Sequence, residues 1–186
     1  MIIALCLLVF AHPGVTQELA PEDAWQALAE GRALLLLRHA LAPGIGDPAE
    51  FTLGECDTQR NLNQEGRRQA KSWQATLQGK GIDQARVFTS AWCRSRDTAD
   101  LMDMGEVTEM AALNSFFNNR GDRQAQSRAT LEQVNALPPG PPIILVSHQV
   151  NITALAGVYP ASNQGVILAL PLTENPTILA DGVKPH

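Results

Sequence analysis

Residues 33–40 read ALLLLRHA, five apolar side chains followed directly by Arg38, His39 and another alanine. Gly31 stands before this run, and a loop rich in proline and glycine follows it over residues 41–60. An apolar run this short, bounded by turn residues, is typical of a strand buried on both faces of a parallel sheet. The arginine and the histidine then lie just past the carboxyl end of a central strand, where open α/β sheets bind their ligands.

Similar apolar segments recur along the chain and predict four more strands, at residues 86–89, 143–146, 166–170 and 177–180. Between them, apolar residues at helical spacing end at glycine, proline or a capping residue. They predict helices at residues 21–31, 63–79, 94–104, 126–137 and 151–157. Strands that alternate with helices predict an α/β sandwich around a mainly parallel sheet.

Three of the predicted strands end in residues that can bind an anion. Arg38-His39 follows the first strand, Ser90 to Arg94 follow the second, and Ser147-His148 follows the third. Because the carboxyl ends of parallel strands meet at one edge of a sheet, we expect these side chains to lie together. Of the 4 histidines, one lies near the N-terminus (His12) and one is the last residue (His186), which leaves His39 and His148 for the folded body.

A pair of histidines with two arginines suits phosphoryl transfer. Imidazole is unprotonated near neutral pH and is a nucleophile for phosphorus. Guanidinium groups stabilise the negative charge that spreads over the phosphoryl oxygens. Each histidine alone is more often structural, but the pair at strand ends indicates a site. The sequence has no convincing cluster of metal ligands, and we expect no metal and no cofactor.

Length and composition limit the choice of function. The 186 residues suit one domain, and a hydrophobic content of 45% is enough for a full core. The net charge of −5 argues against a nucleic-acid partner, because such proteins carry a basic surface. A phosphorylated small molecule is the partner that the residue set favours.

The first residues read MIIALCLLVFA, an apolar run over residues 1–11 that is too short to span a bilayer. It is typical of the hydrophobic region of a secretory signal peptide. We therefore expect a leader over residues 1–17, a single domain over residues 18–186, and export to the periplasm or the medium. The alternative is a buried first strand in a cytoplasmic protein. We do not expect an integral membrane protein.

Four segments carry a resemblance to a known family: LLLRHA (35–40), RNLNQEGRRQA (60–70), VFTSAWCRSRDTA (87–99) and LVSHQVNITALAG (145–157). In this order they resemble the motifs of the histidine phosphatase superfamily, which includes the phosphoglycerate-mutase-like enzymes. A single Arg-His pair is weak support, whereas four ordered motifs are specific.

The resemblance implies a three-layer α/β/α sandwich and metal-independent hydrolysis of a phosphomonoester, as in histidine acid phosphatases. It implies that His39 becomes phosphorylated and that Arg38 and Arg94 bind the phosphoryl oxygens. It also implies that His148 contacts the same phosphate as a charged hydrogen-bond donor. For an exported enzyme, phosphorylated sugars or lipopolysaccharide of the cell envelope are the expected substrates.

One part of the family pattern is missing. Many members carry a glutamate proton donor between the second arginine and the second histidine, and others an aspartate directly after that histidine. Here Ser115 and Gln149 stand at these places. Asp122 is the nearest carboxylate on the loop and our candidate for the catalytic acid, with Glu109 a more distant option. A solvated surface charge is an equally good interpretation of Asp122.

The missing acid leaves other functions open. A compact phosphohistidine protein phosphatase is the nearest alternative, because its substrate has a leaving group that needs less protonation. A second alternative is a phosphate-binding module that has lost its proton donor and does not catalyse. A third is an unrelated α/β domain that carries these histidines by coincidence.

Other residues near the motifs have two interpretations each. Arg60 is as well suited to hold a loop as to touch ligand, whereas Arg96 is expected at the surface. The Phe116-Phe117 pair is expected in the core rather than in a substrate wall. Within the family fold, a disulfide between Cys56 and Cys93 would tie the loop after the first strand to the wall of the site.

Overall fold

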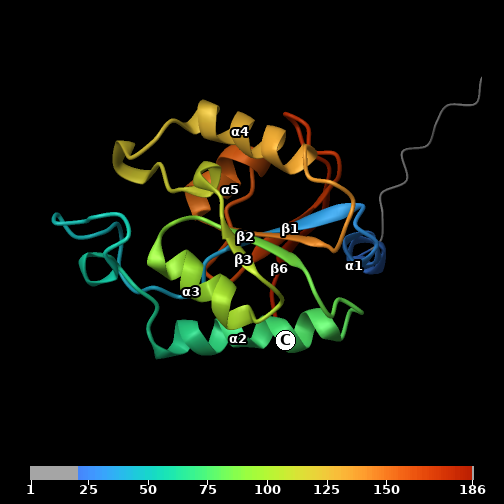
Figure 1. The fold of residues 1–186 in the computed structure, drawn as a ribbon, viewed down its shortest axis with the longest axis horizontal. Coiled ribbons are helices and arrows are strands. Elements are labelled where there is room, and N and C mark those ends of the chain that lie inside the picture. The colour runs from blue at the N-terminus through green and yellow to red at the C-terminus, as the bar shows by residue number, and fades with distance from the viewer. Residues whose placement is uncertain (1–20, 186) are drawn as a thin grey trace, which may run out of the picture.

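A six-stranded sheet forms the middle layer of the computed structural model, which describes residues 21–185 (Figure 1). Its strand order is β3-β2-β4-β1-β5-β6. The strands are β1 (Ala33–Arg38), β2 (Arg86–Thr89), β3 (Val107–Glu109), β4 (Ile143–Ser147), β5 (Gly165–Ala169) and β6 (Ile178–Val183). The first four are parallel, while β5 runs antiparallel to both β1 and β6. The mainly parallel sheet is therefore confirmed.

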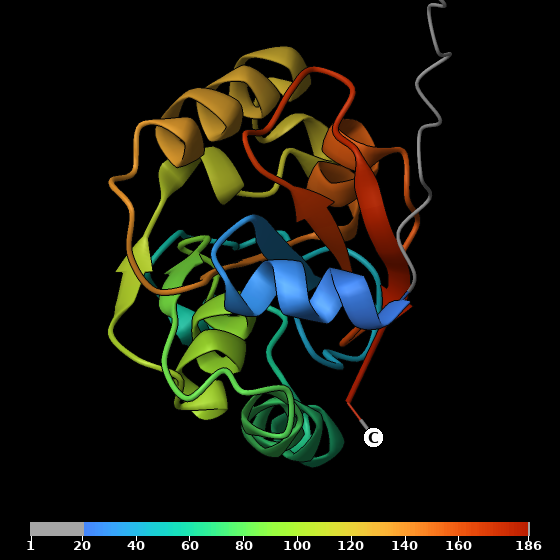
Figure 2. The ribbon, with the colours of Figure 1, turned by 90° about the vertical axis from the view of Figure 1, so that its right-hand side faces the viewer.

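Helices cover both faces of this sheet. They are α1 (Pro21–Ala29), α2 (Gln64–Gln78), α3 (Cys93–Met102), α4 (Arg123–Asn135) and α5 (Gln149–Ala156). In Figure 1, α2 and α3 lie below the sheet, and α4 and α5 lie above it. Residues of α1, which faces the viewer in Figure 2, pack into the same core cluster as those of α2 and α3. This is the three-layer α/β/α sandwich that the resemblance implied, and it agrees with the α/β sandwich that the sequence pattern predicts.

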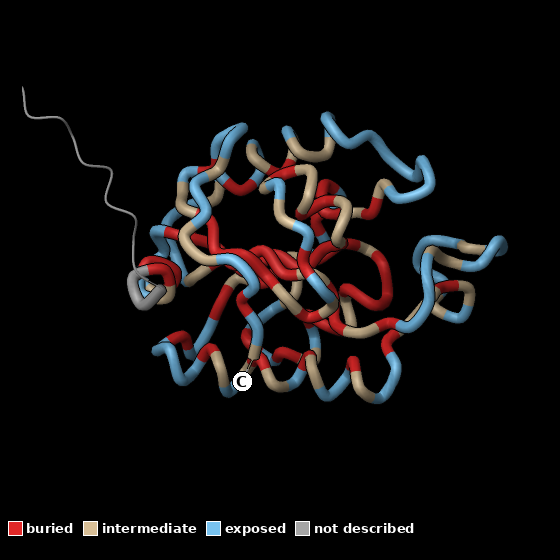
Figure 3. Tube along the Cα trace, turned by 180° about the vertical axis from the view of Figure 1, so that it is seen from behind, coloured by how far each residue is buried: buried red, intermediate tan, exposed pale blue. Residues whose placement is uncertain are grey.

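The leucines of β1 supply both halves of the core. Leu35 and Leu37 pack with α1, α2 and α3, while Leu34 and Leu36 pack with α4 and α5. Successive side chains of a strand point to opposite faces, so a strand covered on both sides needs apolar residues throughout. The buried residues accordingly concentrate in the centre of the molecule (Figure 3).

Helix α2 packs closely against the loop that follows β1. Its N-cap Asn63 accepts a hydrogen bond from the Gly66 amide at 2.8 Å. A Cβ atom at Gly66 would lie 2.1 Å from the carbonyl oxygen of Leu41, so only glycine allows this approach. The glycine of the second motif thus fixes the loop that carries the chain away from His39.

Some sequence expectations do not apply to the described residues or miss an element. The predicted leader, with Cys6 and His12, and the terminal His186 lie outside residues 21–185. The strand β3 and three short 3-10 turns, at residues 56–58, 111–113 and 117–119, were not predicted. Within the part that the structure describes, no helix is both long and apolar enough to span a bilayer.

Candidate active site

The ends of β1, β2 and β4 meet at one edge of the sheet, where they form a pocket. In the sheet register Arg38 lies beside Ser147, and Thr89 beside Val146, so the three predicted segments are neighbours. The pocket has a volume of about 200 Å³ and is lined by Arg38, His39, Gly44, Ile45, Gly46, Arg60, Arg94, Ser115, Phe117, His148, Gln149, Val150 and Tyr159. The structure therefore brings together Arg38, His39, Arg94 and His148, but not Asp122.

His39 is held with one ring nitrogen available. Its Nδ1 lies 2.8 Å from the carbonyl oxygen of Ala40, which only accepts, so Nδ1 carries the proton. Nε2 then has a free lone pair, and it accepts a hydrogen bond from Arg94 Nε at 3.2 Å. Burial, and next the charge of Arg94, lower the pKa of His39 well below its usual range. The imidazole is therefore unprotonated at neutral pH.

His148 stands across the pocket from His39, with 5.4 Å between the ring centroids. Its Nε2 lies 2.7 Å from Ser90 Oγ, while its Nδ1 is buried without a hydrogen-bond partner among the described residues. Burial and the charge of Arg94 lower the pKa of His148 well below its usual range as well. His148 is thus neutral in this arrangement, and its role as a charged donor to a phosphate stays a prediction.

Arg94 is fixed by a carboxylate that the sequence analysis did not single out. Its Nη1 donates to Asp47 Oδ1 at 2.6 Å, and the two side chains are only 4% and 5% exposed. Trp92 Nε1 donates to the other carboxylate oxygen at 3.0 Å, and the backbone amide of Arg60 donates to Oδ1 at 3.1 Å. Burial raises the pKa of Asp47, but Arg94 and these hydrogen bonds outweigh it and hold that pKa below the usual range.

Two further arginines line the pocket. Arg38 Nη1 donates to the carbonyl oxygen of Pro160 at 2.9 Å, and its buried Nε has no partner among the described residues. Arg60 Nε donates to the carbonyl oxygen of Gly46 at 2.8 Å, and Nη1 donates to that of Ala42. Burial and the charge of Arg94 lower the pKa of Arg60 to about 10, which leaves it cationic at neutral pH. Arg60 therefore holds the loop and also faces the pocket.

A disulfide between Cys56 and Cys93 joins the loop after β1 to the first residue of α3. The predicted pairing is confirmed in the structure. Gln59 adds a second link, because its Oε1 accepts a hydrogen bond from the Cys93 amide at 3.0 Å. Both links lie next to Arg94, so they hold the loop that carries Asp47 against the helix that carries its arginine.

The model of the histidine phosphatase superfamily (branch 1) matches residues 34–117, the span that contains Arg38, His39 and Arg94. Over this span, which is less than half of the 186 residues, the chain is similar to the histidine phosphatase superfamily. Among curated proteins, none matches it by sequence.

Solved structures of the same fold extend the likeness beyond the span of the family model. Mycobacterial hydrolase 1 has a TM-score of 0.59 and 17% identity over 82% of this chain and 99% of its own. Mycobacterial glucosyl-3-phosphoglycerate phosphatase with inorganic phosphate has a TM-score of 0.58 and 15% identity over 82% of this chain and 98% of its own. The protein histidine phosphatase SixA with tungstate has a TM-score of 0.53 and 15% identity over 78% of this chain and 93% of its own. At these identities the likeness shows the fold.

Asp122, the predicted catalytic acid, lies elsewhere in the structure. It is the N-cap of α4, and its carboxylate accepts a hydrogen bond from the Ala125 amide at 2.8 Å. Glu109, the other option, pairs with Arg96 at 3.4 Å. Neither residue lines the pocket. A carboxylate bound to the first turn of an exposed helix start is a stabilising cap, which is why its position in the sequence was misleading.

Among the described residues, no aspartate or glutamate lines the pocket. Ser115 and Gln149, which stand where relatives carry acids, both line it. The same part of the chain contains no group of three or more histidines, cysteines or carboxylates that would hold a metal ion. Phe117 corrects another expectation, since it lines the pocket instead of packing in the core.

Proposed function

We propose that this protein is a phosphatase that hydrolyses a phosphomonoester through a phosphohistidine intermediate on His39. The observation that carries the proposal is the position of His39. Its unprotonated Nε2 opens into a pocket with three arginines, and Nδ1 is fixed by the Ala40 carbonyl. The match of residues 34–117 to the model of the histidine phosphatase superfamily supports the same reaction class. Hydrolysis of the acid phosphatase type belongs to this proposal.

In the first step, His39 Nε2 forms a bond to phosphorus while the bond from phosphorus to the ester oxygen breaks. The ester oxygen keeps the electron pair and takes up a proton from solvent, so the alcohol leaves. In the present arrangement, Arg94 Nε donates to the same lone pair at 3.2 Å. A phosphoryl oxygen that takes over this N–H frees the lone pair and gains a charged donor.

In the second step, a water molecule attacks phosphorus and the bond to Nε2 breaks. The electron pair of the broken bond returns to His39 Nε2. The attacking water loses one proton to solvent, and the other proton stays on the inorganic phosphate that leaves. Arg38, Arg60 and Arg94 face the pocket and stabilise the oxygens in both steps. His148 offers its unpartnered Nδ1, and a bound dianion raises the pKa of this ring and favours its charged form.

A second candidate substrate class follows from the absence of a carboxyl group from the described pocket lining. Without a strong proton donor, the leaving group must depart with little protonation. A phosphohistidine or an acyl phosphate meets this condition better than an alkyl ester. The fold shared with SixA supports this alternative. A steep fall of kcat across phosphates of rising leaving-group pKa favours it, whereas a flat dependence indicates a proton donor from elsewhere.

The central test compares the wild type with His39→Ala on p-nitrophenyl phosphate, with a chelator and no added metal. Loss of the nucleophile is expected to lower kcat by more than about 1,000-fold. Arg128→Ala on α4 is the matched control, because Arg128 does not line the pocket. Denaturing the wild type in alkali or detergent, where the nitrogen–phosphorus bond survives, is expected to trap phosphate on His39. Equal rates for the wild type and His39→Ala would leave only a phosphate-binding module.

We further propose that the protein is exported. The apolar residues 1–11 and the disulfide between Cys56 and Cys93 support this, since disulfides persist in oxidising compartments. Fractionation of a bacterial host that expresses the whole chain, with N-terminal sequencing, tests the proposal. We expect a shortened chain outside the cytoplasm. A full-length cytoplasmic chain would contradict it.

A further inference from the structure

Exposed apolar side chains gather at the mouth of the pocket. In residues 21–185, five large hydrophobic residues are exposed, and three of them line this pocket. These are Ile45 at 93% exposure, Phe117 at 41% and Tyr159 at 76%, which we call the apolar rim. Single exposed hydrophobic residues are ordinary on a protein surface, but a cluster around a binding pocket marks an apolar contact.

The apolar rim is built from three separate loops. Ile45 follows β1, Phe117 follows β3, and Tyr159 follows α5. The first two loops touch, because a Cβ atom at Gly46 would lie 3.7 Å from Phe117 Cε1. The positive φ of 70° at Gly46 also favours glycine there. Segments far apart in the sequence thus place apolar side chains around one opening.

Two uncharged polar residues of the lining, Gln149 and Ser115, each make a hydrogen bond within the protein. Gln149 Nε2 donates to Thr153 Oγ1 at 2.7 Å. Ser115 Oγ accepts a hydrogen bond from the Phe117 amide at 3.3 Å. The charged lining groups are the three arginines, and their guanidiniums suit the phosphate. The apolar rim is the most exposed part of this lining, and we take it as the surface that meets the rest of the substrate.

We propose that the substrate carries an apolar group, an alkyl chain or an aryl ring, directly next to its phosphate. This inference rests on the proposed phosphatase function. The phosphate lies on the arginines beside His39, and the apolar group covers Ile45, Phe117 and Tyr159. Removing both apolar surfaces from water favours binding. The substrate class is thus a lipid-like or aromatic phosphate instead of the phosphorylated sugar that export suggested.

Binding of phosphonates measures this preference without turnover, because their carbon–phosphorus bond is not hydrolysed. Isothermal calorimetry on the wild type compares methyl-, butyl- and octylphosphonate. We expect affinity to rise about twofold to fourfold per methylene near the phosphate, which corresponds to ~0.4–0.8 kcal/mol each. Phenylphosphonate tests whether an aryl ring binds the apolar rim as well as an alkyl chain does. A terminal hydroxyl, in 4-hydroxybutylphosphonate, is expected to weaken binding relative to butylphosphonate.

Variants locate the preference on the apolar rim. Ile45→Ala, Phe117→Ala and Tyr159→Ala are each expected to lower the ratio of octyl to methyl affinity by about threefold to tenfold. Using the ratio cancels any change in folded fraction. Ile178→Ala is the matched control, because Ile178 is 42% exposed on β6 and does not line the pocket. Its ratio is expected to equal that of the wild type.

The outcomes separate this inference from the phosphatase proposal. Equal affinities across the alkyl series, or equal effects of Ile178→Ala and the rim variants, would overturn the apolar substrate class. The phosphatase proposal survives either of these outcomes if the turnover of p-nitrophenyl phosphate still depends on His39. If turnover does not depend on His39 while octylphosphonate binds best, the phosphatase proposal fails and the apolar site remains. If no phosphonate binds, the apolar substrate class is overturned, and the turnover of p-nitrophenyl phosphate alone decides the phosphatase proposal.

Discussion

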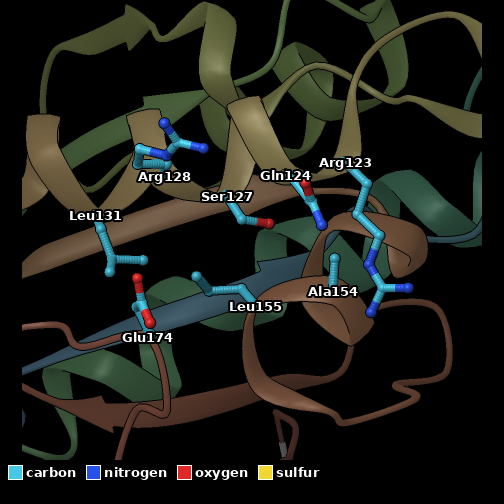
Figure 4. A pocket seen from close by; sticks show the side chains of 8 residues that line it. All are labelled: Arg123, Gln124, Ser127, Arg128, Leu131, Ala154, Leu155 and Glu174. Carbon is cyan, nitrogen blue, oxygen red and sulfur yellow. The ribbon is translucent and has the colours of Figure 1, made fainter.

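The pocket at the strand ends and the groove between α4 and α5 both contain arginines, but the surroundings of those arginines differ. The groove is the larger, at about 440 Å³, and it is lined by Arg123, Gln124, Ser127, Arg128, Leu131, Ala154, Leu155 and Glu174 (Figure 4). Arg123 and Arg128 are exposed on α4 and stand well apart. Among the described residues, neither of these two side chains has a hydrogen bond or an ion pair. In the smaller pocket, Arg94 is buried and paired with Asp47.

This difference shows that fixed charges, and not the size of a hollow or its number of arginines, distinguish the candidate site. An arginine side chain loses about 2 kcal/mol of rotamer freedom when it is ordered. Asp47, Trp92 and the disulfide order Arg94 or its surroundings before a substrate arrives. Electrostatic stabilisation of a transition state is strongest when the donors are already in place.

The sharpest test of the comparison replaces one arginine in each place. Arg94→Ala is expected to lower kcat/KM for an aryl phosphate by about 30-fold to 1,000-fold, or ~2–4 kcal/mol. Arg128→Ala in the groove and Arg96→Ala on the same helix as Arg94 are expected to change it less than about twofold. Equal losses for Arg94→Ala and Arg96→Ala would mean that α3 presents a different face to the substrate.

Asp47→Asn tests whether the fixing of Arg94 matters. The carboxamide removes the charge that neutralises the guanidinium and cannot accept through both of its terminal atoms. We expect kcat/KM to fall about 30-fold, or ~2 kcal/mol. Glu109→Gln is the matched control. Glu109 pairs with Arg96, which lies on the same helix as Arg94, but this second ion pair is exposed. If the two variants lose activity equally, Asp47 does not prepare Arg94.

Low pH should lower the stability of the protein through the two histidines of the pocket. The groove is lined by no histidine and should contribute nothing to this effect. The pKa values of His39 and His148 are lowered in the folded protein by burial and by Arg94. Below pH of about 6.5 the unfolded chain therefore binds protons that the folded chain does not, and the free energy of unfolding falls. Above that pH this contribution is complete.

Urea unfolding at pH 7.5 and pH 5.5 measures this effect. We expect a loss of roughly 1–2 kcal/mol in the wild type, since each histidine contributes up to about 1.4 kcal/mol per pH unit. His39→Ala is expected to show a smaller difference between the two pH values, whatever its absolute stability. An equal pH dependence of the unfolding free energy in both proteins would show that folding does not lower the pKa of His39.

The smallest expected effect concerns Asp122 at the start of α4. Asp122→Ala removes the cap of this helix and is expected to lower the free energy of unfolding by about 1 kcal/mol. Because the carboxylate does not line the pocket, kcat should stay within about twofold of the wild type. A loss of kcat close to that of Arg94→Ala would restore Asp122 as a catalytic acid.

The sequence was informative where a local pattern specifies a local structure. The run ALLLL predicts β1 because a strand covered on both faces needs apolar side chains at every position, and the Asn63 cap predicts the start of α2. The strand β3 escaped prediction, since Val107–Glu109 is short, lies at the sheet edge and has no buried residue. Its pairing with β2 depends on a neighbour that the local sequence does not show.

For the site, the sequence by itself placed Arg38, His39, Arg94 and His148 at or just after the ends of strands. It could do so because each strand is recognised from a run of neighbouring apolar residues. Tertiary structure alone decided that Asp47 pairs with Arg94 and that Asp122 caps a helix. It also decided that the apolar rim surrounds the opening of the pocket. Asp47 and Arg94 lie 47 residues apart, and the packing of a loop against a helix brings such groups together.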